Sequence, residues 1–344
     1  MLNFDDTLLE EIVIHKVGSK SQDDAITISE NPLNVDENIK SLLKKYFTRF
    51  FKDLPFYRFS HESDLALNES YSFIRDIFND PTSLYINSVK LARHLYQVSD
   101  HPNIKSGEFY VAYFDYVLVG EESGPAIGLF KSENKDTYLK VYEENRQFNV
   151  ENEQGININK LDKGCLILNL EEEEGYKMMI IDNTNRNSEA QYWMDKFLRV
   201  EAIADNFYHT HHYLSMCRDF AMEAFPEAAK ADQLALANES EKFFREQSNF
   251  DKVSYHEKVL QDPEVIERFE NYKDDYQQEK MIEIVDEFEV APSAVKKLKK
   301  VFKSVIKLDK NFHIYVHGNR DFIKRGYDEG LDLNYYQVFF KEES

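Results

Sequence analysis

The sequence predicts an α+β protein, with an N-terminal antiparallel sheet flanked by helices and a mainly helical C-terminal part that ends in a basic helix and short strands. Three observations support this fold class. Between residues 107 and 182, short runs rich in Val, Ile, Tyr and Phe alternate with turn residues, as in an antiparallel meander. Residues 205–280 read as successive helices. After Pro292, lysines and apolar residues separate onto different faces of one helix.

The length favours two domains. The chain has 344 residues, of which 42% are hydrophobic, enough for a sizeable core. We place the boundary near residue 203, which gives an α+β domain over residues 1–203. Residues 204–344 then form a mainly helical domain with the basic helix and a small terminal sheet.

The N-terminal part reads as a hairpin, three helices and a run of strands. The hairpin is expected from strands at 9–17 and 25–29, and the first helix at 35–51 has Asn34 or Asp36 as its cap. Two further helices cover 68–78 and 82–98. The strands are predicted at 109–119, 126–131, 137–142, 147–150, 164–170 and 176–182. A short helix or strand around Trp193 closes the domain.

The C-terminal part reads as four helices at 205–225, 227–247, 252–260 and 264–280. Asp251 and Asp262 stand where the last two would begin, and Pro263 suits a first helical position. A short strand over 284–290 precedes the basic helix. Strands at 312–317 and 335–340 follow it.

The basic helix is the element with the clearest chemistry. It is predicted to begin at Pro292 and Ser293 and to end near Leu308, with one apolar stripe of Val295, Leu298, Phe302, Val305 and Ile306. Residues 292–310 contain seven lysines and one acid, Asp309. Neighbouring lysines on a helix repel one another, and a polyanion would relieve that repulsion. A solvated lysine face without a partner is the simpler alternative.

Charge is strongly segregated along the chain. The formal net charge is −21, yet residues 292–344 hold 11 basic and 7 acidic residues, a net charge of +4, and the other residues carry −25. An acidic body discourages indiscriminate nucleic-acid binding but allows binding through one basic face. The candidate nucleic-acid-binding residues are Lys296, Lys297, Lys299, Lys300, Lys303, Lys307, Lys310, His317 and Arg320.

Two other groups of residues carry possible chemistry. Glu133, Lys135 and Asp136 have the acid and lysine content of metal-dependent nucleases, although the stretch reads as a hairpin turn. The sequence also contains a histidine cluster, for which surface exposure or helix packing is a simpler explanation than metal binding, although the sequence does not decide between them. The cluster comprises His209, His211 and His212.

Several familiar functions have no motif in this chain. There is no phosphate loop, no dinucleotide fingerprint and no nucleophile elbow, so we expect no cofactor, no metal and no catalytic residues. Cys165 and Cys217 lie among apolar residues, as expected for free thiols in a reducing cytoplasm. The acidic N-terminus does not read as a signal peptide, and no apolar run is long enough to span a membrane.

Four long stretches resemble the bacterial nucleoid-associated proteins of the NdpA type. They are GLFKSENKDTYLKV at 128–141, GININKLDKGCLI at 155–167, DNTN…EAQYW at 182–193, and VFKSVIKLDKNFHIYVHGN at 301–319. The resemblance implies a cytoplasmic bacterial protein that associates with the nucleoid and binds DNA. It brings no catalytic residues, so the lysine assignments rest on charge and periodicity alone.

Our leading hypothesis is a non-enzymatic, nucleoid-associated protein that contacts DNA phosphates through the lysine-rich helix with weak sequence specificity. Double-stranded DNA is the expected partner, RNA is an alternative polyanion, and a homodimer is expected because symmetry doubles weak contacts. A different hypothesis is an adaptor whose acidic body binds a basic protein. A third is a metal-dependent nuclease centred on Glu133, Lys135 and Asp136.

Overall fold

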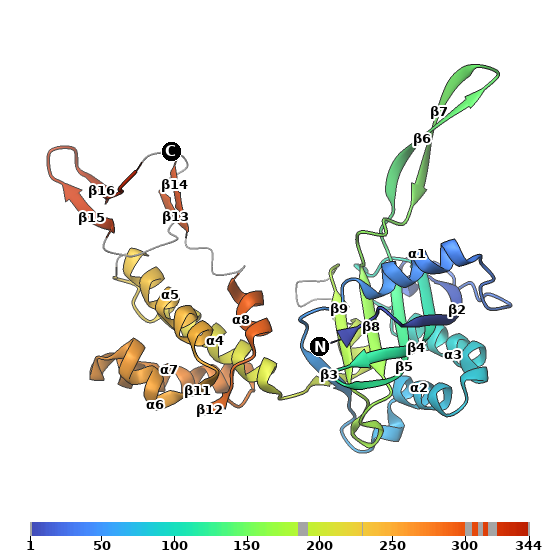
Figure 1. The fold of residues 1–344 in the computed structure, drawn as a ribbon, viewed down its shortest axis with the longest axis horizontal. Helices are drawn as coiled ribbons and strands as arrows, with labels where there is room; N and C mark the ends of the chain where they lie inside the picture. Colours follow the sequence, from blue (N-terminus) through green and yellow to red (C-terminus); the bar gives the residue numbers. More distant parts are fainter. Residues whose placement is uncertain are drawn as a thin grey trace. The chain divides into compact units, whose positions relative to one another are not determined.

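The chain divides into two compact units, Met1–Ile203 and Ala204–Ser344. The computed structural model describes residues 2–184, 192–228, 230–299, 305–308, 312–315 and 322–342. It confirms the α+β class, with a large antiparallel sheet in the first unit and helices dominating the second (Figure 1). In the described part of the chain, no helix combines the length and apolar character needed to cross a membrane.

One eight-stranded sheet organises the first unit. Its order is β1-β4-β5-β8-β9-β3-β10, with β2 also paired to β4, and the pairings are antiparallel. The strands are β1 (Leu2–Asn3), β2 (Leu8–Val17), β3 (Phe56–Phe59), β4 (Gly107–Val119), β5 (Glu122–Ser132), β8 (Lys163–Leu168), β9 (Met178–Asp182) and β10 (Val200–Ala202). The sequence pattern did not predict β3 or β10, which are three or four residues long and lie at one side of the sheet.

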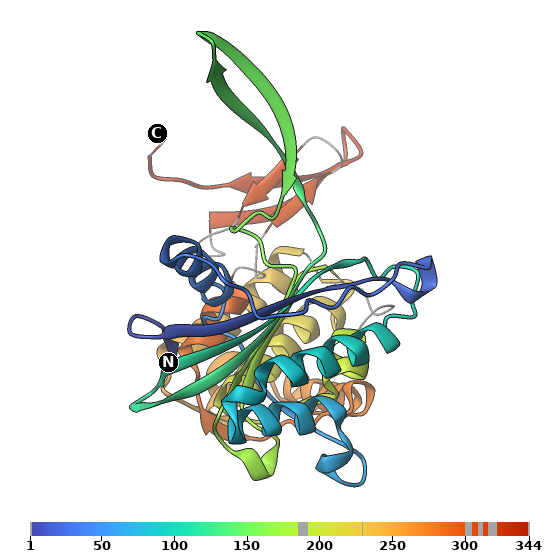
Figure 2. The same cartoon turned by 90° about the vertical axis from the view of Figure 1, so that its right-hand side faces the viewer.

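Helices cover both faces of this sheet, on opposite sides in Figure 2. On one face lie α2 (Glu69–Asn79), α3 (Leu84–Gln97) and the π-helical turn Tyr192–Leu198. The other face is covered by α1 (Glu37–Thr48), where Phe47 stacks on Phe130 at 4.2 Å between ring centroids. Because both faces are buried, β4 and β5 read as nearly continuous apolar runs.

Local signals set several helix starts. Asp36 accepts a hydrogen bond from Ile39 N, which makes it the cap of α1. Asp251 and Asp262 cap the helices that follow them, with Pro263 in the first turn, as predicted. Short 3₁₀ turns at Lys20–Gln22, Leu65–Leu67, Pro81–Ser83 and Glu172–Glu174 complete the connections of the first unit.

A long hairpin extends from the first unit. It consists of β6 (Asp136–Glu144) and β7 (Gln147–Gly155), which pair along their whole length. Figures 1 and 2 show it projecting away from the large sheet. Both of its faces are largely exposed to solvent.

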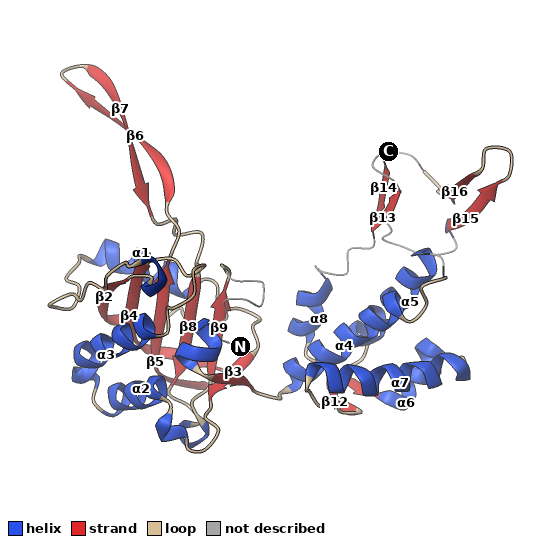
Figure 3. Cartoon of the chain, turned by 180° about the vertical axis from the view of Figure 1, so that it is seen from behind, coloured by secondary structure: helices blue, strands red, loops and turns tan. Residues whose placement is uncertain are grey.

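The second unit is built from helices around an aromatic core. Tyr213 contacts Phe250 at 4.1 Å between ring centroids, and Phe250 stacks on Phe288 at 4.9 Å. The helices, seen in Figure 3, are α4 (Asn206–Glu223), α5 (Lys230–Glu246), α6 (Lys252–Tyr255), the π-helical turn His256–Leu260, α7 (Pro263–Lys280) and α8 (Pro292–Lys299). Strands β11 (Asn249–Asp251) and β12 (Glu287–Glu289) pair beside them.

Two hairpins end the second unit. They are β13 (Val305–Leu308) with β14 (Phe312–Tyr315), and β15 (Ile323–Asp328) with β16 (Leu333–Val338). A small apolar cluster joins them to the helices. Its members are Leu234, Ile323, Met222, Leu308, Ile314 and Tyr336. The sequence predicted no strand at β15, because Lys-Arg-Gly-Tyr-Asp lacks apolar alternation.

Two predicted elements are wrong. The basic helix does not continue to Leu308: α8 ends at Lys299, and Val305 and Ile306 form strand pairs with Tyr315 and Ile314. β-Branched residues favour such a strand once an antiparallel partner supplies the hydrogen bonds. The predicted strand at 25–29 is reduced to one bridge between Lys16 and Thr27, on the edge of β2 opposite to its long pairing with β4.

Candidate functional site

Helix α8 presents two lysines to solvent. Ala294, Val295 and Leu298 are buried against the core of the second unit, whereas Lys296 and Lys297 are exposed. Pro292 suits the first turn because the missing N–H needs no partner there. The helix therefore has the amphipathic arrangement needed to offer ammonium groups on one side.

The two exposed lysines differ in their surroundings. The Nζ atom of Lys297 lies 5.6 Å from the centroid of the Phe207 ring on α4. This contact partly desolvates the ammonium, and desolvation lowers the pKa of Lys297. Close by, burial lowers the pKa of His211 to about 4, so that imidazole is neutral near pH 7.

Two of the other candidate residues, Lys299 and Lys307, lie in the described part of the chain, and they belong to different elements. Lys299 is the last residue of α8, and Lys307 lies on β13 opposite His313, so the prediction that Lys307 belongs to the basic helix is wrong. His313 and Tyr315 on β14 are exposed. The remaining candidates lie outside the described residues; they are Lys300, Lys303, Lys310, His317 and Arg320.

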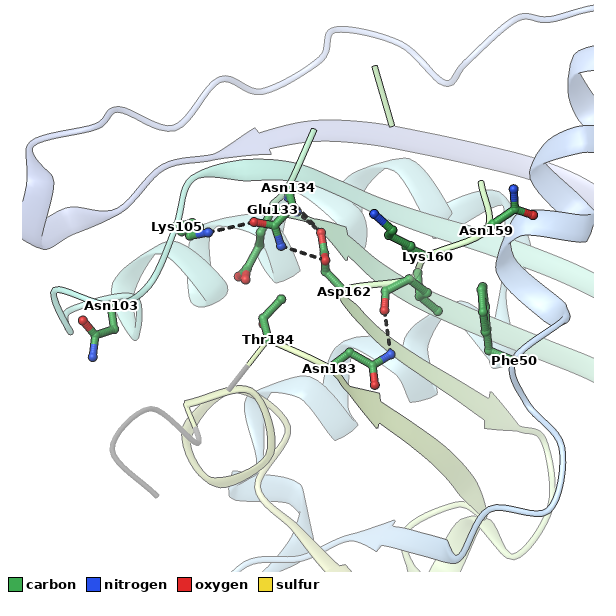
Figure 4. Close-up of a pocket in the computed structure, with 11 residues that line it drawn as sticks. Phe50, Asn103, Lys105, Glu133, Asn134, Asn159, Lys160, Asp162, Asn183 and Thr184 are labelled. Carbon is green, nitrogen blue, oxygen red and sulfur yellow. Dashed lines mark hydrogen bonds between the residues drawn. The ribbon is translucent and has the colours of Figure 1, made fainter. Parts of the chain in front are cut away.

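A polar cleft of about 550 Å³ opens at one edge of the large sheet (Figure 4). Asp162 organises it: Oδ2 accepts hydrogen bonds from the backbone N–H groups of Glu133 and Asn134 at 2.7 and 2.8 Å. Lys105 donates to Asn134 Oδ1 at 2.7 Å. The other lining residues are Phe50, Asn103, Asn159, Lys160, Leu161, Asn183 and Thr184.

The nuclease candidates are each neutralised by a different partner. Glu133 pairs with Lys131 at 3.0 Å, and Lys135 pairs with Glu108 at 2.6 Å. Asp136 pairs with Lys160 at 2.9 Å. In the residues that the structure describes, no group of three or more His, Cys, Asp or Glu side chains is placed to hold a metal ion.

Behind the cleft lies a buried charge network that the sequence reasoning missed. Lys131 Nζ donates to Glu133 Oε1, to Tyr192 Oη at 3.0 Å and to the carbonyl oxygen of Lys105 at 2.7 Å. Lys163 donates to both carboxylate oxygens of Asp182 at 2.7 and 2.8 Å. Burial alone would raise the pKa of Glu133, but the ammonium groups of Lys131 and Lys163 outweigh it and lower that pKa.

This network could have been inferred from position. Lys131 follows the buried run of β5, and Lys163 begins the buried strand β8. A lysine inside a sheet that is covered on both faces needs a carboxylate partner. The network ties three strand ends to the turn at Tyr192, and it leaves neither ammonium exposed to a ligand in the cleft.

The histidine cluster packs against aromatic rings. His211 lies nearly parallel to Phe207, His212 contacts Tyr208 at 4.2 Å between ring centroids, and His209 faces Phe288. Cys165 and Cys217 are buried free thiols, and burial raises the pKa of each. These contacts favour the packing explanation for the histidines.

The site and fold define a two-unit α+β protein with an internally neutralised polar cleft and a solvent-exposed lysine helix. The family model of the nucleoid-associated protein YejK, NA37, matches residues 13–332, so the chain belongs to this family. The resemblance to nucleoid-associated proteins inferred from the four stretches is thereby confirmed. A comparison with curated proteins gives no match.

Proposed function

We propose that this protein is a non-enzymatic DNA-binding component of the bacterial nucleoid that works in the cytoplasm and contacts phosphates through its lysine-rich segment, residues 296–310. The family supports a nucleoid-associated role. The observation that carries the DNA contact is the exposure of Lys296 and Lys297 on a helix whose other face is buried. Within a sequence of net charge −21, residues 292–310 hold seven lysines and one acid.

The contact works by charge neutralisation. A lysine that pairs with a phosphate releases condensed counterions from the DNA, so affinity falls steeply as salt rises. Phosphate contacts carry little sequence information, hence weak specificity, and they would also accept RNA. Of the described lysines in this segment, Lys296, Lys297 and Lys299 belong to α8 and Lys307 belongs to β13.

The separate ion pairs of Glu133, Lys135 and Asp136 support the non-enzymatic part of the proposal. A two-acid, one-lysine nuclease site needs its groups turned toward one metal ion, and here each has its own partner. Incubating supercoiled DNA with the protein and Mg²⁺ or Mn²⁺ should give no nicking. Metal-dependent nicking that copurifies with the protein would contradict this.

A charge-reversal variant tests the DNA contact. Replacing Lys296, Lys299, Lys300 and Lys303 by Glu should abolish retention of double-stranded DNA in gel-shift titrations at several salt concentrations. The slope of log K against log[salt] should become less steep by roughly one unit for each phosphate contact that the variant removes. Far-UV circular dichroism should show an unchanged fold.

A matched variant controls for the change in net charge. Lys16, Lys20, Lys45 and Lys52 are exposed lysines of the first unit, and their replacement by Glu alters net charge by the same amount. This control should retain DNA. Equally weakened binding in both variants, or unchanged binding in the first, would show that residues 296–310 do not make the DNA contact. If the purified protein lacks DNA affinity but retains one copurifying partner, the adaptor hypothesis is favoured.

A further inference from the structure

The β6–β7 hairpin has two chemically different faces. The register pairs Val141 with Val150, and neighbouring side chains on the same face come from Leu139 and Phe148. We call these four residues the apolar arm face. They are 70% (Leu139), 61% (Val141), 77% (Phe148) and 61% (Val150) exposed, so the rest of the unit leaves this face open to solvent.

The opposite face of the hairpin satisfies itself with polar cross-strand contacts. Tyr138 Oη donates to Glu153 at 2.6 Å, and Tyr142 Oη donates to Glu151 at 2.6 Å. Lys140 also pairs with Glu153 at 3.2 Å. This face is therefore suited to water, and these contacts hold the two strands in register.

The exposed apolar arm face conflicts with the usual behaviour of a hairpin in water. A two-stranded ribbon alone is marginally stable, and it usually needs packing on one face to persist. Contiguous exposed apolar residues on a regular strand pair mark interaction surfaces or aggregation sites. The ribbon thus requires an occupant for this one face.

The charges of the hairpin indicate which kind of molecule can cover the apolar arm face. Residues 136–155 contain five acids and two basic residues, so phosphate groups would be repelled by this arm. A basic protein would be drawn to Glu151 and Glu153 on the polar face rather than to the apolar one. Eight residues of the hairpin point to the same side as the apolar arm face, and only Glu143 among them is charged.

We propose that the apolar arm face packs against the same face of a second copy of this chain, forming a two-fold symmetric dimer. The net charge of −21 opposes self-association, and salt screens that repulsion, so two copies meet at the least electrostatic cost through a surface that brings few like charges together. A two-fold contact needs one self-complementary patch, which the Val141–Val150 pair and its two large neighbours supply. This inference does not depend on the DNA contact.

Sedimentation equilibrium of the nuclease-treated full chain tests the proposal. The wild type should be a reversible dimer at micromolar concentration. Replacing Leu139, Val141, Phe148 and Val150 by Thr keeps strand propensity but removes apolar surface, and it should raise the dimer dissociation constant at least about 30-fold. The matched control Lys140→Thr with Glu151→Thr, on the polar face, should leave the dissociation constant unchanged.

Cross-linking provides a second measurement. Since Cys165 and Cys217 are buried, Val141→Cys adds one accessible thiol near the expected symmetry axis. Mild oxidation should give a disulfide-linked dimer with Val141→Cys but not with Lys140→Cys. A wild type that sediments as a monomer, or a dimer that the Thr variant leaves intact, would overturn the proposal, because the face would then have another occupant or none.

Discussion

Each unit contains a pair of lysines, and the two pairs have opposite environments. Lys131 and Lys163 in the first unit have fully buried side chains that pair with Glu133 and Asp182. Lys296 and Lys297 in the second unit extend from α8 into solvent. The difference shows that a lysine is available to an external polyanion only where its own protein does not already neutralise it.

The energetic reason is desolvation. Moving an ammonium out of water costs several kcal/mol, and only close carboxylates and hydrogen bonds offset it. Lys131 and Lys163 meet this requirement within the sheet, so they stabilise one arrangement of the first unit. Lys296 is exposed and avoids this cost, whereas Lys297 meets part of it beside the Phe207 ring; among the described residues, neither has a carboxylate partner that would keep it from an external phosphate. The same residue type therefore serves structure in one unit and, as we propose, binding in the other.

Breaking the buried ion pair between Lys131 and Glu133 should give the largest effect on stability. We expect Lys131→Met to lower the free energy of unfolding by about 3 kcal/mol, because Glu133 then loses its main counter-ion in a buried site. Urea denaturation measures this loss of stability when it is followed by the fluorescence of Trp193. Trp193 is the single tryptophan of the chain and is buried in the first unit.

Two controls accompany this variant. Lys296→Met removes an exposed lysine and should change stability by less than about 0.5 kcal/mol. Lys131→Met combined with Glu133→Gln should cost less than the sum of the single changes, because no unpaired carboxylate remains. Equal costs for Lys131→Met and Lys296→Met would refute the distinction between the two pairs.

His15 extends the comparison to a buried base that stays uncharged. Its Nδ1 accepts a hydrogen bond from Ser29 N at 3.1 Å, so Nε2 carries the proton and donates to Ser88 Oγ at 2.9 Å. Burial lowers its pKa from 6.5 to about 4. Protonation of Nδ1 would place its N–H against the backbone N–H of Ser29, so that hydrogen bond would be lost.

Stability of the first unit should therefore fall in acid. Between pH 6.5 and about 4 the unfolded chain binds a proton at His15 that the folded chain does not, so the contribution is complete above this window and is lost as pH falls. We expect a loss of about 2 kcal/mol between pH 7 and pH 5. In His15→Gln, urea denaturation should show a smaller change over that interval. An identical pH dependence in the variant would exclude His15 as its source.

Lys297 tests whether its aromatic contact contributes to stability. Lys297→Met keeps the aliphatic stem above Phe207 but removes a charge that burial disfavours, so it should raise the stability of the second unit by about 0.5 kcal/mol. Thermal unfolding followed by the helical circular dichroism signal would measure it. Lys297→Arg, which retains a cation, should leave stability at the wild-type level; a loss of stability in Lys297→Met would show instead that the cation–π contact outweighs desolvation.

Lys296 should show the smallest effect on folding and a distinct effect on binding. Lys296→Gln should leave the unfolding free energy within about 0.5 kcal/mol of wild type. The salt dependence of DNA binding should nevertheless weaken by about 0.9 in slope, as expected for one phosphate contact. Fluorescence anisotropy of labelled duplex DNA at several salt concentrations measures this slope, and an unchanged slope would exclude Lys296 from the interface.

Local sequence signals predicted much of the fold. The caps Asp36, Asp251 and Asp262 and the β-rich runs between residues 107 and 182 led to elements that the structure contains. The same reasoning failed at residues 305–308, where Val305 and Ile306 suited either a helical stripe or a strand. The partner β14 decided that ambiguity by pairing with them. The strands 137–142 and 147–150 were expected, but their exposure on both faces was not.

The sequence by itself determined the α+β class, the helix starts and the separation of charge, because periodicity, capping and composition act between near neighbours. Only the tertiary structure decided which charges are neutralised and which surfaces stay open. Lys131 meets Tyr192 across 61 residues, and such pairing depends on how distant strands assemble. Whether a side chain is buried, paired or exposed is a property of that assembly, so it could not be deduced from local pattern alone.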